Sequence, residues 1–161
     1  MLSINDFDAL VSNANNNLLL RVPALISYTD TNDLSKNITG NESVIAQEVG
    51  DNANIYAIWS RLLSSDKWTV MYIGQRSESD IIGRIKQHLF TTPSGTRSKI
   101  EKVKELVLKD YQIGISTIFV TPDPLRLSVE DQLIFKNTNN ASELPWNHKS
   151  RNVSLPTTKS T

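Results

Sequence analysis

The 161-residue chain contains no cysteine, which excludes thiol nucleophiles, cysteine-ligated zinc sites and disulfide bonds. It also has no apolar run approaching the roughly 20 residues that a membrane helix needs. The N-terminal stretch MLSINDFDAL lacks the basic segment and apolar core of a secretion signal. We therefore expect an unprocessed cytoplasmic protein without a membrane partner. The length predicts one domain with its own hydrophobic core.

The chain also has no net charge at neutral pH, because it contains 17 basic and 17 acidic residues. The two parts of the chain nevertheless differ. Residues 1–54 contain Arg21 and Lys36 against seven acidic residues, a net charge of −5, so residues 55–161 carry +5. Such asymmetry is typical of a basic face for a polyanion, and equally of ordinary solvated surface charge. No zinc finger, helix-turn-helix or RNA-binding motif accompanies it.

From residue 54 onward the apolar pattern is regular. The segments 54–61 and 67–74 are rich in β-branched and aromatic residues, and the polar stretch between them predicts a hairpin. Ser79 and Ser128 are the expected N-caps of two later helices. The pattern predicts an α+β fold with a small three-stranded antiparallel sheet flanked by helices. The elements after the hairpin are a helix over 79–89, a helix over 96–109, a strand over 113–122 and a helix over 128–137.

The first fifty residues are rich in Asn, Asp, Ser and Thr around two apolar patches. Ser3 is a candidate cap for a short helix with apolar residues on one face, over 4–11. The segment 18–28 is strand-like, but Pro23 favours an edge strand or an extended arm over a central strand. We expect residues 1–53 to form an N-terminal extension, and residues 151–161 to form a flexible tail.

Several short motifs follow one another in a fixed order. Asn-Ile-Tyr ends at Tyr56 and Tyr-Ile-Gly spans 72–74; Arg84 and His88 then lie one helical turn apart. Glu130 follows near the start of a helix, and Pro-Trp-Asn ends at Asn147. Over residues 54–147 the chain resembles the GIY-YIG nuclease superfamily. Its arginine–histidine spacing is similar to that of the homing and restriction branches.

The chain departs from the family pattern in two places. Asn54 stands where the family usually has glycine, and neither Trp59 nor Ser60 supplies the lysine often found shortly after the first triplet. Arg61 and Lys67 are alternative sources of that charge. The first departure concerns backbone geometry and leaves the tyrosine in place.

The resemblance implies a catalytic domain over residues 54–150 that hydrolyses nucleic-acid phosphodiesters with a divalent metal ion. Such hydrolysis needs an activated water, stabilisation of the phosphoryl oxygens and a Lewis acid. By resemblance, Glu130 holds one Mg2+ or Mn2+ ion, since both prefer oxygen ligands. Arg84 clamps the scissile phosphate with its fork of donors.

The remaining implied catalytic residues surround the water. Tyr56 orients or deprotonates it, and Tyr72 and His88 tune Tyr56 through hydrogen bonds. A phenol deprotonates water only if nearby positive charge favours phenolate, and Arg84 together with the metal would supply that charge. Asn147 positions the substrate or pins the final loop.

The expected substrate is double-stranded DNA, cut by a sequence-specific restriction-like or mobile-element enzyme. A homodimer is expected where both strands are cut. Residues 1–53 are candidates for recognition or dimerisation. Two alternatives stay open: a nuclease toxin or repair incision nuclease of the same fold, and a catalytically inactive nucleic-acid-binding module. The expected nucleic-acid contacts are Gly74, Arg97, Lys99, Lys102, Lys149 and Arg151.

Overall fold

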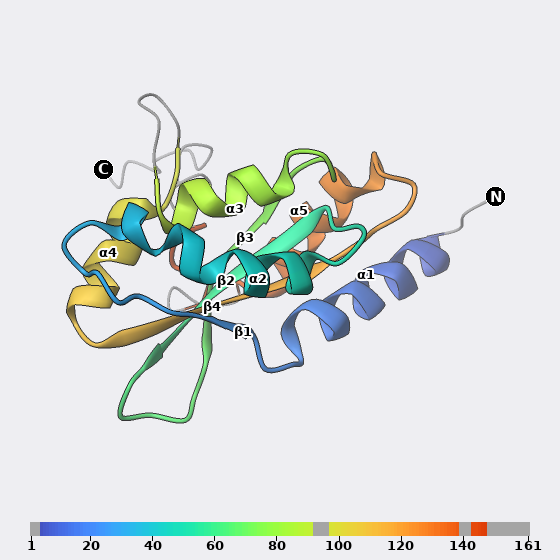
Figure 1. Ribbon diagram of the computed structural model, residues 1–161. Helices are drawn as coiled ribbons and strands as arrows, with labels where there is room; N and C mark the ends of the chain where they lie inside the picture. Colours follow the sequence, from blue (N-terminus) through green and yellow to red (C-terminus); the bar gives the residue numbers. More distant parts are fainter. Residues whose placement is uncertain (1–3, 92–96, 139–142, 148–161) are drawn as a thin grey trace, which may run out of the picture.

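The computed structural model of the chain describes residues 4–91, 97–138 and 143–147, which form an α+β fold around a four-stranded antiparallel sheet (Figure 1). The strand order is β1-β4-β2-β3. The predicted three-stranded sheet is therefore wrong by one strand. The fourth strand is β1 (Ala24–Ile26), which comes from the N-terminal region and pairs with β4. β1 directly follows Pro23 and lies at the sheet edge, where the missing N–H of proline does not interrupt a ladder.

The other three strands follow the predicted pattern. They are β2 (Ile55–Leu62), β3 (Thr69–Gln75) and β4 (Tyr111–Ile118). β2 and β3 form the expected hairpin, and β2 also pairs with β4, which makes it a central strand. The register between β2 and β3 shifts after Ile58, because Ile58 lies opposite Tyr72 but Trp59 lies opposite Val70. Such a bulge bends the strand locally.

The element order β-β-α-α-β-α after residue 54 is confirmed, but several boundaries differ. Ser79 precedes the N-cap position, which Asp80 holds without a side-chain cap. Ser128 lies inside its helix, whose N-cap is Pro124, a residue with φ already suited to a helix start. No described helix is long and apolar enough to cross a membrane. The helices are α1 (Ile4–Leu19), α2 (Ile38–Val49), α3 (Ile81–Leu89), α4 (Ile100–Leu108) and α5 (Leu125–Lys136), with the short 3-10 helix η1 (Leu34–Asn37) before α2.

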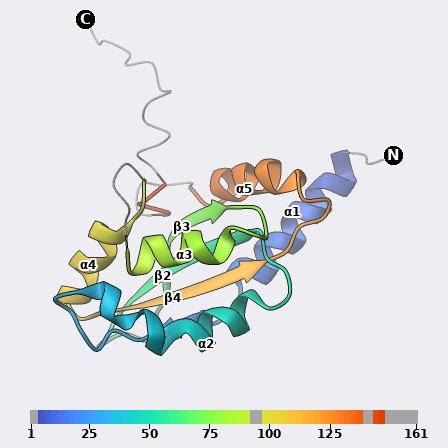
Figure 2. The same ribbon diagram turned by 45° about the horizontal axis from the view of Figure 1, so that its top comes forward.

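Helices cover both faces of the sheet (Figure 2). On one face α2, α3 and α4 bury apolar residues such as Ile45, Ile85 and Val103 against alternate residues of β2 and β4. On the other face α1 and α5 pack against the intervening residues of β2, with Leu18 and Leu133 fully buried. The segment before residue 54 thus contributes to both cores. Its expected role in recognition or dimerisation stays a prediction.

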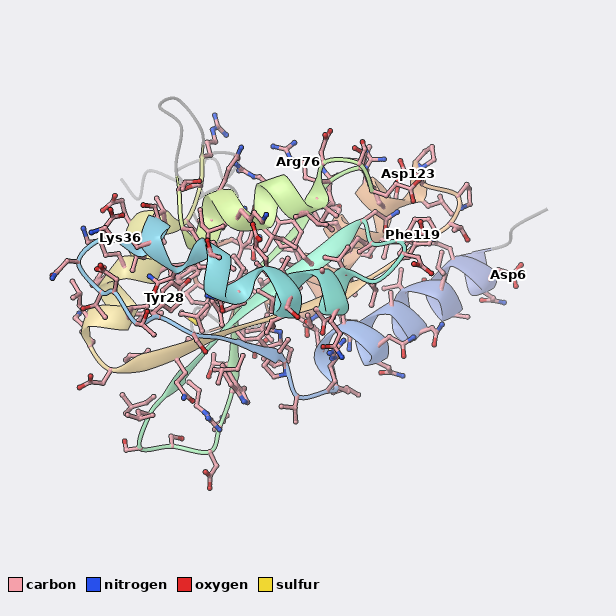
Figure 3. All side chains as sticks on the ribbon, in the orientation of Figure 1. Asp6, Tyr28, Lys36, Arg76, Phe119 and Asp123 are labelled. Carbon is pink, nitrogen blue, oxygen red and sulfur yellow. The ribbon has the colours of Figure 1, made fainter. Side chains whose placement is uncertain are left out.

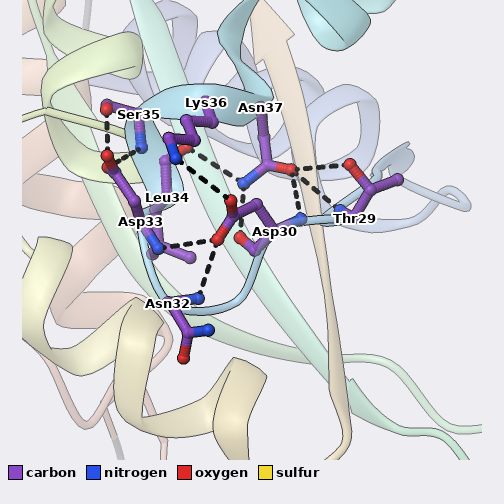
Figure 4. Close-up of polar contacts among 8 residues, drawn as sticks. All are labelled: Thr29, Asp30, Asn32, Asp33, Leu34, Ser35, Lys36 and Asn37. Carbon is purple, nitrogen blue, oxygen red and sulfur yellow. Dashed lines mark hydrogen bonds and ion pairs between the residues drawn. The ribbon is translucent and has the colours of Figure 1, made fainter.

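Buried asparagines shape the N-terminal segment, in which α2 was not predicted. The Asn37 side chain accepts the N–H groups of Thr29 and Asp30 at 2.8 and 3.0 Å, which folds the loop between β1 and α2 (Figure 4). One turn later Asn41 pairs with both the N–H and the C=O of Ser27, each at 2.8 Å. Polar residues on the buried side of α2 hide its helical period in the sequence, and these tertiary bonds satisfy them.

Candidate active site

Three of the predicted site residues form a cluster of rings. In the sheet register Tyr56 lies opposite Gly74 and Ile58 opposite Tyr72, so both tyrosines project from the same face. α3 covers that face and supplies His88. The ring centroids are 5.6 Å apart for Tyr56 and His88, 5.3 Å for Tyr72 and His88, and 6.1 Å for the two tyrosines. The structure therefore brings these three side chains together.

Gly74 makes room for this cluster. A Cβ atom at position 74 would lie 2.5 Å from the hydroxyl oxygen of Tyr56 and 2.8 Å from the Tyr72 ring. Real Cβ atoms do not approach other atoms so closely, so the position requires glycine for its lack of a side chain. The nucleic-acid contact expected of Gly74 stays a prediction.

The hydrogen bonds of His88 have a fixed direction. Its Nδ1 accepts the backbone N–H of Lys99 at 2.9 Å, and its Nε2 lies 2.7 Å from the Tyr56 hydroxyl oxygen. Burial, followed by the charges of Arg84, Lys99 and Arg76, lowers the pKa of His88 to about 3, so the ring is neutral. A neutral ring that accepts at Nδ1 carries its proton on Nε2 and donates it to Tyr56. His88 in this state cannot take a proton from Tyr56.

The two tyrosines differ in accessibility. Tyr56 is 1% exposed, and its burial raises its pKa well above the ordinary value of 10.0, against the smaller lowering effect of Arg84 and Arg76. Tyr72 is partly exposed, and its pKa is raised by burial and then by the charge of Glu130. Both groups are therefore phenols at neutral pH. The charges of Arg84 and Arg76 alone do not produce the phenolate considered from the sequence, because burial outweighs them.

Three cations act on the ring cluster. Arg84 is partly exposed; its Nη1 donates to Gln87 at 2.9 Å and its Nη2 to the carbonyl oxygen of Arg97 at 3.1 Å. The Lys99 ammonium lies 5.1 Å from the centre of the Tyr72 ring, a cation–π contact. Arg76 is exposed just after β3 (Figure 3), and its charge lowers the pKa of both tyrosines and of His88.

Arg76 is the site residue that the sequence interpretation missed, although it follows the Tyr-Ile-Gly triplet by only two positions. The alternatives proposed for the missing lysine lie elsewhere. Arg61 hydrogen-bonds Gln112 and lies 4.8 Å from the Trp68 ring centre, and Lys67 precedes that tryptophan in the chain. Neither is among the charges that act on the ring cluster.

Glu130 acts on the cluster from a helix in the other layer of the fold. It belongs to α5, which packs on the opposite sheet face and against the edge strand β3, and its charge raises the pKa of Tyr72. Burial, followed by the neighbouring Asp131 charge, raises the pKa of Glu130 from 4.5 to about 7. Within the described part of the chain, Glu130 has no hydrogen-bond or ion-pair partner, and none of its oxygens is a fully buried unpaired atom.

This carboxylate fits a magnesium or manganese ion. Across residues 4–91, 97–138 and 143–147, no three His, Cys, Asp or Glu side chains gather in a metal-binding group. Mg2+ keeps several waters and is commonly held by only one or two carboxylates together with substrate phosphate. A carboxylate that is partly exposed and has no hydrogen-bond or ion-pair partner among the described residues matches this demand. Glu130 is therefore the residue that would hold such an ion.

Asn147 pairs with the backbone of β3. Its Oδ1 accepts the Ile73 N–H at 2.9 Å, and its Nδ2 donates to the Ile73 C=O at 3.0 Å. The backbone N–H of Trp146 adds a bond of 3.0 Å to the Met71 carbonyl oxygen. Asn147 is 4% exposed. Of its two expected roles, this geometry is that of a residue that pins the final loop beside Tyr72.

The predicted nucleic-acid contacts are only partly described. Arg97 and Lys102 are exposed, on the chain leading into α4 and on α4 itself. Lys149 and Arg151 lie outside the described residues. Comparisons of the chain with protein-family models, curated proteins and solved structures found no match.

Proposed function

We propose that this protein is a metal-dependent endonuclease that hydrolyses DNA phosphodiester bonds as a restriction-like or mobile-element enzyme. The observation that carries the proposal is the convergence of Arg76, Arg84 and Lys99 on the rings of Tyr56, Tyr72 and His88, together with the charge effect on Tyr72 of a carboxylate that has no partner among the described residues. A phosphodiester is an anion that gains charge on its oxygens during hydrolysis, and preorganised cations stabilise that change.

In the proposed mechanism the scissile phosphate lies beside Arg84, whose remaining guanidinium donors contact its non-bridging oxygens. Arg76 and Lys99 supply further positive charge. Tyr72 is the more accessible tyrosine and is influenced by Glu130, so its hydroxyl orients the attacking water. Tyr56 lies behind it. His88 donates to Tyr56, which leaves the Tyr56 hydroxyl hydrogen available to Tyr72.

Glu130 would hold Mg2+ or Mn2+, which supplies a Lewis acid for the leaving oxygen when bound. The ionised form of Glu130 is the one that binds a cation, so its raised pKa predicts that metal affinity increases as the pH rises through about 7. Asn147 has no catalytic role in this proposal. It keeps the final loop against the strand that carries Tyr72.

The proposal is tested by incubating the purified protein with supercoiled plasmid, linear duplex DNA and RNA in Mg2+, and then mapping the cut ends. Discrete duplex fragments with fixed ends are expected for a restriction-like enzyme. Two staggered cuts at one site would indicate a homodimer on symmetric DNA, because one active site usually cuts one strand. Glu130→Gln, which preserves shape and removes the charge, is the matched inactive control.

Other outcomes identify the alternatives. A smear of products from any DNA would indicate a nuclease toxin. Cuts confined to damaged or branched substrates would indicate a repair incision enzyme. DNA binding without cutting in either Mg2+ or Mn2+ would contradict the proposal and leave a binding module. The retained tyrosine, arginine, histidine and glutamate side chains favour the enzyme.

A further inference from the structure

Asn54 joins three elements of the fold at the edge of the candidate site. It is fully buried. Its side-chain Nδ2 donates to the Val120 carbonyl oxygen at 2.8 Å and its Oδ1 accepts the Val120 N–H at 2.8 Å. Its backbone carbonyl accepts the Arg76 N–H at 3.1 Å, and its own N–H donates to the Ile118 carbonyl oxygen at 3.0 Å. Asn54 thus ties the start of β2 to the ends of β3 and β4.

A glycine is not needed at this position for backbone reasons. Among the described residues other than glycine, positive φ angles occur only at Asp110 and Leu144, so Asn54 has an ordinary conformation. Instead, the Asn54 side chain, which stands in place of the usual glycine, makes hydrogen bonds through both its amide NH2 group and its amide oxygen. This departure from the family pattern adds contacts that glycine cannot make.

The contacts of Asn54 continue into α5. Its Nδ2 also donates to Asp123 Oδ1 at 3.1 Å, and the other oxygen of Asp123 pairs with Arg126. The Nε of Arg126 donates to Gln75, the last residue of β3, at 2.8 Å. Asp123 lies at the chain segment leading into α5 (Figure 3).

Arg126 and Glu130 are four residues apart on α5, so they project from the same side of the helix. The contact of Arg126 with the end of β3 therefore holds the side of α5 that carries Glu130 against this strand. We infer that Asn54 is a positioning residue for the proposed nuclease site: through Asp123 and Arg126 it holds the side of α5 that carries Glu130 against the end of β3. The effect on metal binding rests on the proposed function, whereas the anchoring of α5 rests on the hydrogen bonds alone.

The test compares Asn54→Ala with Asn41→Ala in the full chain. Asn41 is the matched control, because it is equally buried and also pairs with one backbone N–H and C=O, but it connects α2 to Ser27 on the other sheet face. Mn2+ affinity is measured with MnCl2 by water-proton relaxation, and amide hydrogen exchange of α5 is measured by mass spectrometry.

We expect Asn54→Ala to weaken Mn2+ binding about tenfold or more, the usual effect of losing a residue that orients a metal ligand. Exchange in α5 becomes faster in the same variant. Asn41→Ala leaves Mn2+ affinity within about twofold of wild type and α5 exchange unchanged. If Asn54→Ala does not fold, Arg126→Met breaks the same network at a partly exposed position and gives the same expected result.

Equal behaviour of the network and control variants in both measurements would overturn the inference. A wild-type protein without measurable Mn2+ affinity would instead remove the metal site of the proposed function. In that case the exchange measurement alone decides the inference: faster α5 exchange in Asn54→Ala than in Asn41→Ala retains it, and equal exchange rejects it.

Discussion

Replacing each tyrosine of the ring cluster by phenylalanine distinguishes a structural role of its hydroxyl group from a catalytic role. Tyr56→Phe removes the oxygen that accepts the His88 Nε2–H at 2.7 Å, inside a site where His88 is fully buried. A buried donor left without a partner costs about 1–3 kcal/mol. For a chain of this size, each kcal/mol lowers the melting temperature by about 2–4 °C. We therefore expect a decrease of about 2–12 °C for Tyr56→Phe.

Tyr72→Phe is expected to change stability little and to slow cleavage strongly. Tyr72 is partly exposed, so water can replace the lost contacts, and the free energy of unfolding changes by less than about 1 kcal/mol. Loss of a hydroxyl that orients the attacking water lowers the cleavage rate about a hundredfold or more. Tyr56→Phe reduces cleavage less than Tyr72→Phe does, because its hydroxyl acts through Tyr72.

Thermal unfolding followed by circular dichroism gives the stability of both variants, and single-turnover cleavage of plasmid DNA at saturating Mg2+ gives the rates. The expected result is a crossover: Tyr56→Phe is the less stable protein and Tyr72→Phe the slower enzyme. A Tyr56→Phe protein that melts with wild type and cleaves more slowly than Tyr72→Phe would refute this reasoning and identify Tyr56 as the residue that meets the water.

Three further predictions concern charge. Glu130→Gln should abolish cleavage and Mn2+ binding while the fold persists. Because the pKa of Glu130 is raised in the folded protein, this group stabilises the fold below about pH 4.5, and that stabilisation is lost as the pH rises through about 7. Urea denaturation across this range should therefore show less pH dependence in the variant than in wild type. Arg84→Lys should slow cleavage about a hundredfold although the charge is kept, because the two-pronged phosphate contact is lost, and a rate within a few-fold of wild type would make Arg84 a surface residue. Arg76→Gln should weaken DNA binding and reduce the salt slope of log K by about 1, whereas Arg61→Gln, remote from the ring cluster, should leave both unchanged, as fluorescence anisotropy at several salt concentrations can check.

Much of the fold was accessible from local pattern. Alternating and helical periods after residue 54 predicted the order of the hairpin, the helices and the third strand. Pro23 favoured an edge strand or an extended arm and did not decide between them. The fourth strand stayed undecided and α2 was not predicted, for a common reason. β1 has only three residues and α2 carries buried asparagines, so the stability of both depends on partners distant in the chain, namely β4 and the loop residues bonded by Asn37 and Asn41.

The candidate site likewise combines features that the sequence indicates with features that depend on the tertiary structure. The sequence by itself placed Arg84 and His88 on one flank of a helix, and its resemblance to a nuclease family grouped them with Tyr56 and Tyr72. Only the tertiary structure decided the rest. The direction of the His88 hydrogen bonds depends on a backbone N–H at Lys99, and the charge effect of Glu130 on Tyr72 depends on the packing of α5 against β3. Which tyrosine stays accessible depends on burial, and burial is a property of the whole packed chain that no local spacing encodes.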